Sequence, residues 1–314
     1  MKAKDLLAPD EIRAFTQRSN WAGARAILVN WAMIAASFAL FAARPSPLTF
    51  VVAVVIIGGR QLALAVLMHE AAHRTLFRSQ WLNDVLTDWL CARPVWVDVA
   101  RYREHHLAHH AHAGTDRDPD RSLVTPFPVT RGALARKVLR DLLIVSGVKR
   151  VVGLVLMDSG RIVYAVSGDV RWLPRQGLGH HLGLFFRNAG PAIVTNLALF
   201  GVLFALGHPW AYATWVAAWL TTYGLFLRIR SMAEHACLEG GRDPLKNTRT
   251  THASWLARLT VAPHEVAFHL EHHLLPTVPY FRLRALHARL RPHMPAEALA
   301  ASYLAVLKIV TTER

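Results

Sequence analysis

The sequence of 314 residues has little cysteine, and Cys91 and Cys237 are its only two. They lie far apart and form no Cys-x-x-Cys pair, which argues against a disulfide framework, a thiolate-bound zinc site or an iron–sulfur cluster. Residues 1–20 are polar and charged. They lack the short apolar region and cleavage site of a signal peptide, so we expect none. Internal repeats and low-complexity stretches are also missing, and we expect a single domain over residues 1–314.

The chain combines a high positive charge with a high apolar content. It has 36 Lys and Arg against 21 Asp and Glu, a net charge of +15, yet 53% of its residues are hydrophobic. Its mean hydropathy is +0.24, whereas a soluble protein of this charge would be more polar. The basic residues flank apolar segments and do not form the single stripe or tail of a nucleic-acid binder. This pattern indicates a membrane protein without a nucleic-acid partner.

Four apolar segments are long enough to cross a bilayer. They are residues 24–43, 48–68, 189–207 and 209–229. About 20 helical residues at ~1.5 Å each cover the ~30 Å hydrocarbon core. Short turns at residues 45–47 and 207–209 join the segments in pairs. We therefore expect an all-α membrane protein with four transmembrane helices arranged in two hairpins.

Charged residues interrupt two other apolar stretches, residues 81–99 and 134–157. Such mixed segments are typical of helices that lie in the membrane interface with basic side chains towards lipid headgroups. Arg60 and Gln61 lie late in the second expected span, where a charge is costly. We expect this helix to protrude into the cytosol, so that Arg60 extends to the interface.

Histidine is concentrated in three clusters. They read His69-Glu-Ala-Ala-His73, His106-Leu-Ala-His109-His110 and His269-Leu-Glu-His272-His273, and they hold eight of the 18 histidines. Spacings of three and four residues place side chains on one face of a helix, and neutral imidazole is the commonest metal ligand. Eight imidazoles exceed the four ligands of a tetrahedral zinc and are enough for two metals with open positions.

The other histidines are less informative. His235 follows the fourth span and could be a ninth ligand, although a supporting or surface role fits its position almost as well. His105 adjoins His106 and is an alternative to it; we prefer His106 because it reproduces the spacing of the third cluster. We expect ordinary buried or solvent-facing side chains at His112, His180, His181, His208, His252, His264, His287 and His293.

The basic residues also orient the four spans. The two hairpin turns contain one basic residue between them, Arg44, whereas cytosolic loops of membrane proteins are rich in Lys and Arg. We therefore expect both termini and all three histidine clusters on the cytosolic side, of the inner membrane if the protein is bacterial. Two crossings separate the first cluster from the third, which returns them to the same face, as a shared metal site requires.

Acidic residues accompany the clusters. Metal-bound imidazoles usually donate their other N–H to a carboxylate or carbonyl. We therefore expect the neighbouring carboxylates to orient the imidazoles, with a solvated loop as the alternative for Asp120. These carboxylates belong to Glu70, Glu104, Asp116, Asp118, Asp120, Glu234 and Glu271.

The first cluster alone also matches the His-Glu-x-x-His pattern of zinc metalloproteases, in which Glu70 would be the general base. A membrane-embedded zinc protease would leave the other six clustered histidines without a role. A metal transporter would need ligands within the spans, whereas these histidines lie beyond the helix ends. Both are weaker alternatives to one shared two-metal site.

The three clusters and the residues that follow them resemble the membrane fatty-acid desaturases. Thr-Asp-Arg-Asp-Pro-Asp follows the second cluster and Leu-Leu-Pro-Thr-Val-Pro-Tyr follows the third, and the likeness extends over about residues 60–287. The resemblance implies two non-haem irons in a cytosolic helical cap above four spanning helices, with His235 as a further ligand. The implied ligands are His69, His73, His106, His109, His110, His235, His269, His272 and His273.

The same resemblance implies an O2-dependent oxidoreductase that desaturates the acyl chain of a lipid, with a hydroxylase or ketolase using the same irons as the alternative. Metal-activated dioxygen can attack an unactivated C–H bond, which acid–base side chains cannot. The reaction consumes two external electrons, and the sequence has no His-Pro-Gly-Gly haem motif, thiolate cluster or nucleotide-binding glycine loop. We therefore expect a separate electron donor, a ferredoxin or a cytochrome b5-like protein, attracted by the basic cytosolic face.

Overall fold

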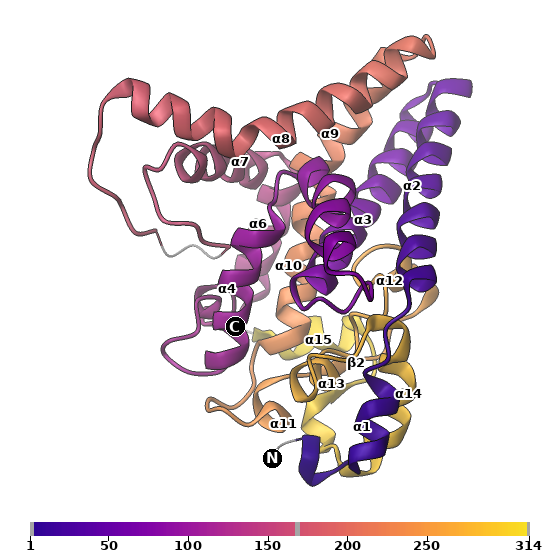
Figure 1. The fold of residues 1–314 in the computed structure, drawn as a ribbon, viewed down its shortest axis with the longest axis vertical. Coiled ribbons are helices and arrows are strands. Elements are labelled where there is room, and N and C mark those ends of the chain that lie inside the picture. The colour runs from indigo at the N-terminus through magenta and orange to yellow at the C-terminus, as the bar shows by residue number, and fades with distance from the viewer. Residues whose placement is uncertain (1–2, 167–169, 313–314) are drawn as a thin grey trace.

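The computed structural model describes residues 3–166 and 170–312, which are mainly helical (Figure 1). The α-helices are α1 (Pro9–Phe15), α2 (Asn20–Ala43), α3 (Pro47–Ala72), α4 (Val99–His112), α5 (Arg121–Val124), α6 (Arg131–Leu142), α7 (Val145–Asp158), α8 (Leu178–Ala205), α9 (Tyr212–Leu220), α10 (Thr222–His235), α11 (Pro244–Asn247), α12 (Trp255–Leu259), α13 (His269–Leu274), α14 (Tyr280–Leu290) and α15 (Tyr303–Ile309). Short 3-10 or π turns are η1 (Ala3–Asp5), η2 (Leu82–Leu86), η3 (Asp88–Ala92), η4 (Arg93–Val95), η5 (Pro209–Ala211), η6 (Arg291–His293) and η7 (Ala296–Ala298).

Strand structure is minimal in the described chain. The strands are β1 (Val129–Thr130), β2 (Thr250–Thr251), β3 (Leu299–Ala300) and β4 (Thr311–Thr312). β1 pairs with β4 and β2 with β3, both in parallel. The expected all-α architecture is confirmed apart from these two short pairings.

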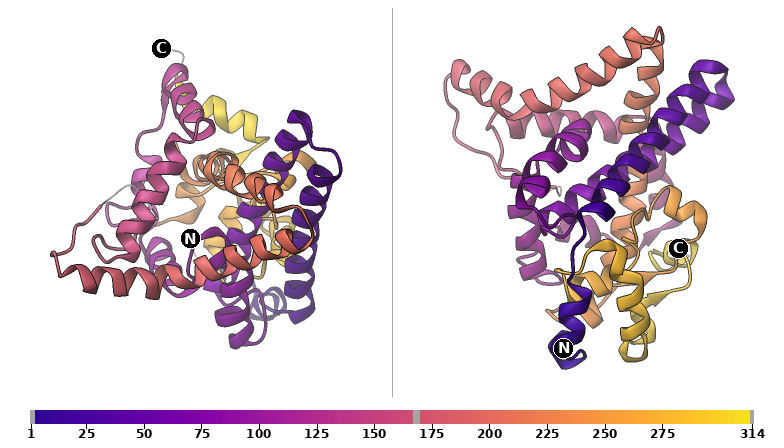
Figure 2. Two further views of the ribbon diagram at one scale, coloured as in Figure 1. Left: turned by 90° about the horizontal axis from the view of Figure 1, so that it is seen from above. Right: turned by 45° about the vertical axis from the view of Figure 1, so that its right-hand side comes forward.

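Helices α2 and α3 form an antiparallel hairpin along one side of the molecule (Figure 2, right). Ser46 begins α3, because its Oγ accepts a hydrogen bond from the Thr49 amide at 3.2 Å and Pro47 occupies the first turn. α3 continues to Ala72, beyond the expected end of the second span. The same helix therefore carries His69 out of the hairpin towards the other histidines.

Three helical segments of the described chain are long and apolar enough to cross a membrane. They are Pro9–Ala43, Pro47–Ala72 and Leu178–Ala205. These segments match the first three expected spans. α8 changes direction about halfway along its length (Figure 1), at Pro191, because proline removes a backbone hydrogen bond and clashes with the preceding turn.

The fourth expected span, residues 209–229, is not one continuous helix. It divides at Thr221 into α9 and α10. The Thr221 hydroxyl donates to the Ala217 carbonyl at 2.5 Å, and Nη2 of Arg150 donates to the Trp219 carbonyl at 2.5 Å. A hydroxyl and a guanidinium thus satisfy carbonyls at the break, and such side-chain bonds are known to bend helices.

Arg60 does not extend to the interface, so that expectation was wrong. The side chain is buried, and its Nη2 donates to the carbonyls of Arg258 at 3.0 Å and Leu259 at 2.6 Å, at the end of α12. Gly59 permits this approach, because a Cβ there would lie 2.3 Å from the Leu259 oxygen. Carbonyls at a helix C-terminus compensate the buried cation, and Arg60 tethers α3 to the segment that leads into the third cluster.

The two stretches expected at the membrane interface have different structures. Residues 81–99 form η2, η3, η4 and the start of α4, whereas residues 134–157 lie in α6 and α7. These two helices meet at Ile144, which has a positive φ of 68°. They expose apolar side chains at Leu139, Leu142, Leu143, Val148 and Val152. An exposed apolar surface beside basic residues suits an interfacial helix pair, and the location in the membrane interface stays a prediction.

Candidate metal centre

The first cluster lies at the end of α3, where His69 occupies the last turn and His73 caps the helix. Arg103 of α4 donates to the carbonyls of Ala71 at 2.9 Å and Ala72 at 2.8 Å. A cation at a helix C-terminus is favourable because it balances the helix dipole. This contact therefore fixes the first cluster against the helix that carries the second.

The second and third clusters lie on α4 and α13, and His235 is the last residue of α10. Asp98 begins α4, with its Oδ1 accepting from the Arg101 amide at 2.8 Å. His106, His109, His269, His272 and His273 are all buried. Four helices thus bring imidazoles into one buried region.

All nine histidines that the sequence singled out meet in two groups. Within each group the candidate ligand atoms lie within 4.8 Å of one another. The five-histidine group contains His69, His73, His106, His110 and His272. The four-histidine group contains His109, His235, His269 and His273. The groups are adjacent, since the rings of His110 and His273 stack with centroids 4.1 Å apart.

Helix geometry explains why the second and third clusters serve both groups. Residues four apart are offset by about 40° around a helix, whereas adjacent residues are offset by about 100°. His106 and His110 accordingly point into one group, and His109 points into the other. In α13 the pair His269 and His273 shares the four-histidine group, while His272 joins the five-histidine group. Each His-x-x-His-His cluster therefore bridges the two groups.

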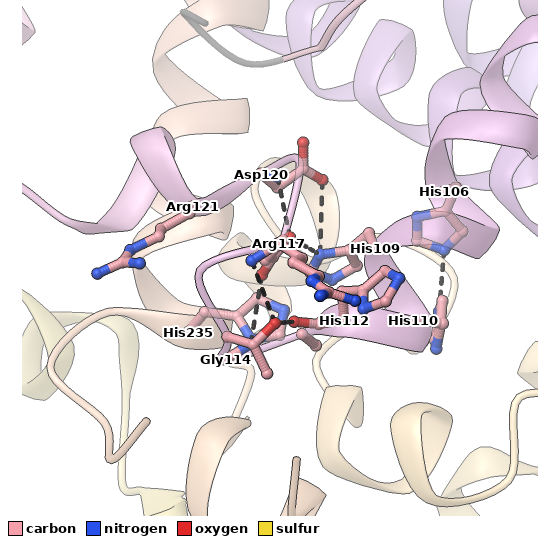
Figure 3. Close-up of polar contacts among 12 residues, drawn as sticks. His106, His109, His110, His112, Gly114, Arg117, Asp120, Arg121 and His235 are labelled. Atoms are coloured by element: carbon pink, nitrogen blue, oxygen red, sulfur yellow. Dashed lines mark hydrogen bonds and ion pairs between the residues drawn. The ribbon is translucent and has the colours of Figure 1, made fainter. Parts of the chain in front are cut away.

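Residues outside the histidine groups contact two of the imidazoles at Nδ1, those of His109 and His235, which Figure 3 labels. Nδ1 of His109 lies 2.8 Å from Oδ1 of Asp118, and Nδ1 of His235 donates to the Asn247 carbonyl at 3.0 Å. The Nε2 atom of each ring is then free to face the group, and Nε2 of His235 lies 2.8 Å from Nε2 of His269. Such contacts fix the orientation of a metal-binding imidazole and raise its basicity.

A buried ion pair supports His269. Its Nδ1 lies 3.4 Å from Oε1 of Glu234, and the same oxygen accepts from Nε of Arg230 at 2.6 Å. Burial raises the pKa of Glu234, and the neighbouring Arg230 opposes that shift. The positive charge of Arg230 thus partly balances the Glu234 carboxylate beside the four-histidine group.

The residues fit a metal-binding role by two independent tests. Nε2 of His69, His73 and His273 is buried without a hydrogen-bond partner in the part of the chain that the structure describes, and each such unpaired group costs about 1–3 kcal/mol. Burial also lowers the pKa of His110 to about 2 and of His235 to about 4. Neutral imidazole is the form that binds metals, so these side chains suit a metal in each group.

His109 behaves differently. Burial opposes its charged form, but the hydrogen bond that His109 donates to Asp118 and the nearby carboxylates outweigh burial and raise the pKa of His109. The same hydrogen bond lowers the pKa of Asp118 against the effect of its own burial. Asp118 thus stays an acceptor, which fixes the His109 N–H at Nδ1.

The expected hydrogen bond from a clustered imidazole to a carboxylate forms at Asp118, whereas Glu234 and Glu70 lie near imidazoles without such a bond. Asp118 and Glu234 contact imidazoles as described, and Oε1 of Glu70 lies 3.6 Å from Nδ1 of His69. Asp120 pairs with His105 at 2.8 Å and lies 3.8 Å from Nδ1 of His109.

The expectation was wrong for the other three carboxylates. Glu104 is exposed and has no polar partner among the described residues. Asp116 is exposed and pairs with Arg121, and Glu271 pairs with His287 and Thr250. On their helices Glu104 and Glu271 point away from the imidazoles, because they are not three or four residues from the histidines that face the groups.

The remaining histidines lie outside both groups in the described chain, in agreement with the expectation for them. His105 bonds Asp120, which decides between it and His106. Sequence reasoning missed Arg230, Tyr102 and Asn247, which support the site. Tyr102 stacks on His106 with ring centroids 5.1 Å apart. The i, i+4 spacing of Arg230–Glu234 and of Tyr102–His106 is the signal that could have found two of these three side chains.

A cavity of about 810 Å³ reaches both histidine groups. His106, His109, His235 and His269 line it on one side, and α7 lines it on the other with Gly153, Leu154 and Met157. Aromatic side chains form much of the remaining wall: Trp96, Tyr102, Tyr164, Trp219 and Tyr223. Charged side chains also line the cavity, and a concave cavity of this size that joins apolar walls to polar groups is typical of a substrate site.

Known proteins match most of this chain. The family model described as fatty acid desaturase matches residues 45–304. A dihydrorhizobitoxine desaturase from Bradyrhizobium elkanii is 26% identical over 236 residues, which cover 74% of this chain and 64% of that protein. The match thus spans a little less than two thirds of that relative.

Two β-carotene ketolases are also similar. The one from Paracoccus sp. strain N81106 is 27% identical over 228 residues, covering 71% of this chain and 72% of that protein. The one from Paracoccus sp. strain PC1 is 25% identical over 268 residues, covering 82% and 88%. The family match includes every histidine of the two groups, and this chain belongs to the fatty acid desaturase family.

Proposed function

We propose that this protein is a membrane-embedded, O2-dependent oxidoreductase that desaturates the acyl chain of a lipid. The observation that carries the proposal is the meeting of nine imidazoles, six buried and three partly buried, in two adjacent groups at the wall of one cavity. Five and four imidazoles suit two metal ions with open positions better than a single tetrahedral zinc. Imidazole is a suitable ligand for iron, and membership of the fatty acid desaturase family supports two irons.

In this proposal the five-histidine group holds one iron and the four-histidine group holds the other. Bound there, the irons supply activation of dioxygen with two external electrons, and hence an oxidant for an unactivated C–H bond. Asp118, Asn247 and the Arg230–Glu234 pair orient the imidazoles of the four-histidine group. The aromatic walls of the cavity hold the chain of the substrate beside the imidazoles and exclude water.

The proposed membrane arrangement has four crossings, at about residues 24–43, 48–68, 189–207 and 209–229, which lie in α2, α3, the second half of α8 and the α9–α10 segment. The turn between α2 and α3 and the turn after α8 lie at one end of the molecule, while α11, α13 and the N-terminus lie at the other (Figure 1). The single basic residue of the two turns, Arg44, supports a cytosolic location for the opposite end. Both termini, the helical cap and the metal centre then face the cytosol, where a ferredoxin or cytochrome b5-like donor supplies the electrons.

Oxygen insertion by a hydroxylase or ketolase is the second candidate, because two of the similar proteins are β-carotene ketolases. The test is mass spectrometry of lipids from a host that expresses the wild type and from one that expresses His272→Ala. We expect a wild-type-specific product that has lost two hydrogens. A product with an added oxygen would favour the second candidate, and the absence of any oxidised lipid would contradict both.

The purified wild-type protein should contain about two irons per chain. Metal analysis after expression in iron-replete medium measures this directly. One zinc and no iron would support the zinc protease and would contradict the proposal.

The contacts of Glu70 argue against that protease. Its Oε2 accepts hydrogen bonds from the Thr75 hydroxyl and the Tyr280 amide, both at 2.9 Å, so the carboxylate is engaged in positioning. We expect Glu70→Gln to lower oxidation only about 10-fold, the effect of a changed outer contact to a metal ligand, as measured from the lipid product. The exposed Glu104 provides a matched control, and Glu104→Gln should leave the rate unchanged. Complete loss of activity in Glu70→Gln, with iron retained, would contradict this role.

A further inference from the structure

The cavity wall carries six cations and five carboxylates, and two of these carboxylates, Asp118 and Asp120, lie beside the histidines. Three of its cationic residues are paired, at 2.5–2.8 Å: Arg101 with Asp158, Arg228 with Asp141 and Arg230 with Glu234. Three more basic residues line the same cavity: Arg140, Lys149 and Arg150. No carboxylate of the described chain pairs with any of these three. On the α6–α7 side of the cavity these three cations therefore have no ion-pair partner in the described chain.

Arg150 is the most enclosed of the three. Its guanidinium lies over the rings of Trp219 and Tyr223, 4.6 and 4.9 Å from their centroids. Nη2 donates to the Trp219 carbonyl, while Nε is buried without a hydrogen-bond partner in the described chain. Gly224 leaves room for the side chain, because a Cβ there would lie 3.2 Å from Nη1. A charge that is partly desolvated and incompletely bonded favours binding of an anion.

The distance from Arg150 to the histidines suits an extended chain. Gly224, beside the guanidinium, precedes His235 by about three turns of α10, which is ~16 Å along the helix. An extended chain of single bonds covers this distance with about a dozen bonds. A substrate whose end group binds Arg150 could thus extend its carbon chain through the aromatic part of the cavity to the imidazoles.

We propose that the substrate is an amphiphile with an anionic end group, a carboxylate or a phosphate, which Arg150 anchors with help from Lys149 and Arg140. This inference deepens the proposed function, since it assumes that the chain of the substrate is oxidised at the histidines. It argues against an uncharged hydrocarbon substrate, which would leave the Arg150 charge in the cavity without an anionic partner. Lys149 and Arg140 are exposed at the α6–α7 side and would meet the anion as it enters.

Equilibrium binding to the full-length protein under anaerobic conditions tests this anchor without requiring turnover. The probes are hexadecanoate, hexadecyl phosphate and the uncharged hexadecanol. The wild type should bind at least one of the two anions about tenfold or more tightly than hexadecanol, as expected for a charged hydrogen bond. Arg150→Gln should abolish this preference, and Arg150→Lys should retain part of it.

Two further variants separate the anchor from folding and from general surface charge. Lys149→Gln has no polar contact to lose in the described chain and should reduce the preference by a smaller factor. Arg136→Gln removes a cation of α6 that is exposed and outside the cavity wall, and it should have no effect.

Equal binding of hexadecanol and both anions by the wild type would overturn the proposal. If inorganic phosphate displaced a bound anion as strongly as hexadecyl phosphate does, the proposal would also be overturned. Such a result would indicate a site for a free anion, to which the alkyl chain contributes nothing. A missing oxidised lipid with a normal binding preference would contradict the proposed function and leave the anchor standing.

Discussion

Oxidation of the host lipid by the His272→Ala variant is expected to fall by more than about 100-fold. His272 belongs to the five-histidine group, although His269 and His273 in the same helix belong to the four-histidine group. Its loss therefore removes a ligand from one group and none from the other. Mutation of a residue that hydrogen-bonds a metal ligand already lowers metal affinity or activity about 10–100-fold. Removal of a ligand itself should lower them further. The variant should also bind fewer than two irons per chain, as measured by metal analysis of the purified protein.

His293→Ala is the matched control for this variant. His293 lies in η6, is exposed and is outside both groups, so its replacement should leave iron content and product formation unchanged. A His272→Ala protein that keeps wild-type iron and wild-type product would remove His272 from the proposed ligands. Such a result would favour the zinc protease, which needs only the first cluster.

Removal of the bound metal should lower the melting temperature by on the order of 10 °C. A ligand that binds only the folded state at 1,000 times its dissociation constant stabilises that state by about 4 kcal/mol. For a chain of this size each kcal/mol corresponds to about 2–4 °C. The buried Nε2 atoms of His69, His73 and His273 give a structural reason, because without a metal they have no partner among the described residues.

Thermal unfolding of the detergent-solubilised protein before and after chelation measures this effect. Returning ferrous iron should restore the original melting temperature, which separates metal loss from damage by the chelator. His293→Ala should respond as the wild type does, whereas His272→Ala should show a smaller shift because it begins with less metal. An unchanged melting temperature after complete removal of iron would show that the groups are stable without metal.

The sequence predicted the eight clustered histidines, the first hairpin and the α8 span because each depends on local pattern, whereas His235 as a ninth ligand followed from the resemblance to the desaturases. Apolar length predicts a spanning helix without knowledge of its neighbours, and the spacing of the clusters places their imidazoles on helix faces. The structure agrees on α2, α3 and α8 and brings all nine histidines together. The preference for His106 over His105 also rested on spacing alone, and the structure agrees with it.

Long-range contacts decided the features that the sequence left open or that were expected differently. Arg60 was expected at the interface, but the carbonyls it meets belong to α12, about 200 residues later. At the division of the fourth apolar segment, the bond from Thr221 to the Ala217 carbonyl is local, but Arg150 comes from α7 and bonds the Trp219 carbonyl. No local pattern around Arg60 or Arg150 contains their distant partners.

The sequence by itself determined which imidazoles are available and how each cluster distributes them around a helix. Only the tertiary structure decided that His109 and His272 lie in different groups, that Asp118 and Asn247 hydrogen-bond the Nδ1 atoms of His109 and His235, and that a cavity with charged walls adjoins the site. The physical reason is that helix periodicity is a property of neighbouring residues, whereas the packing of α3, α4, α10 and α13 against one another determines where their faces meet.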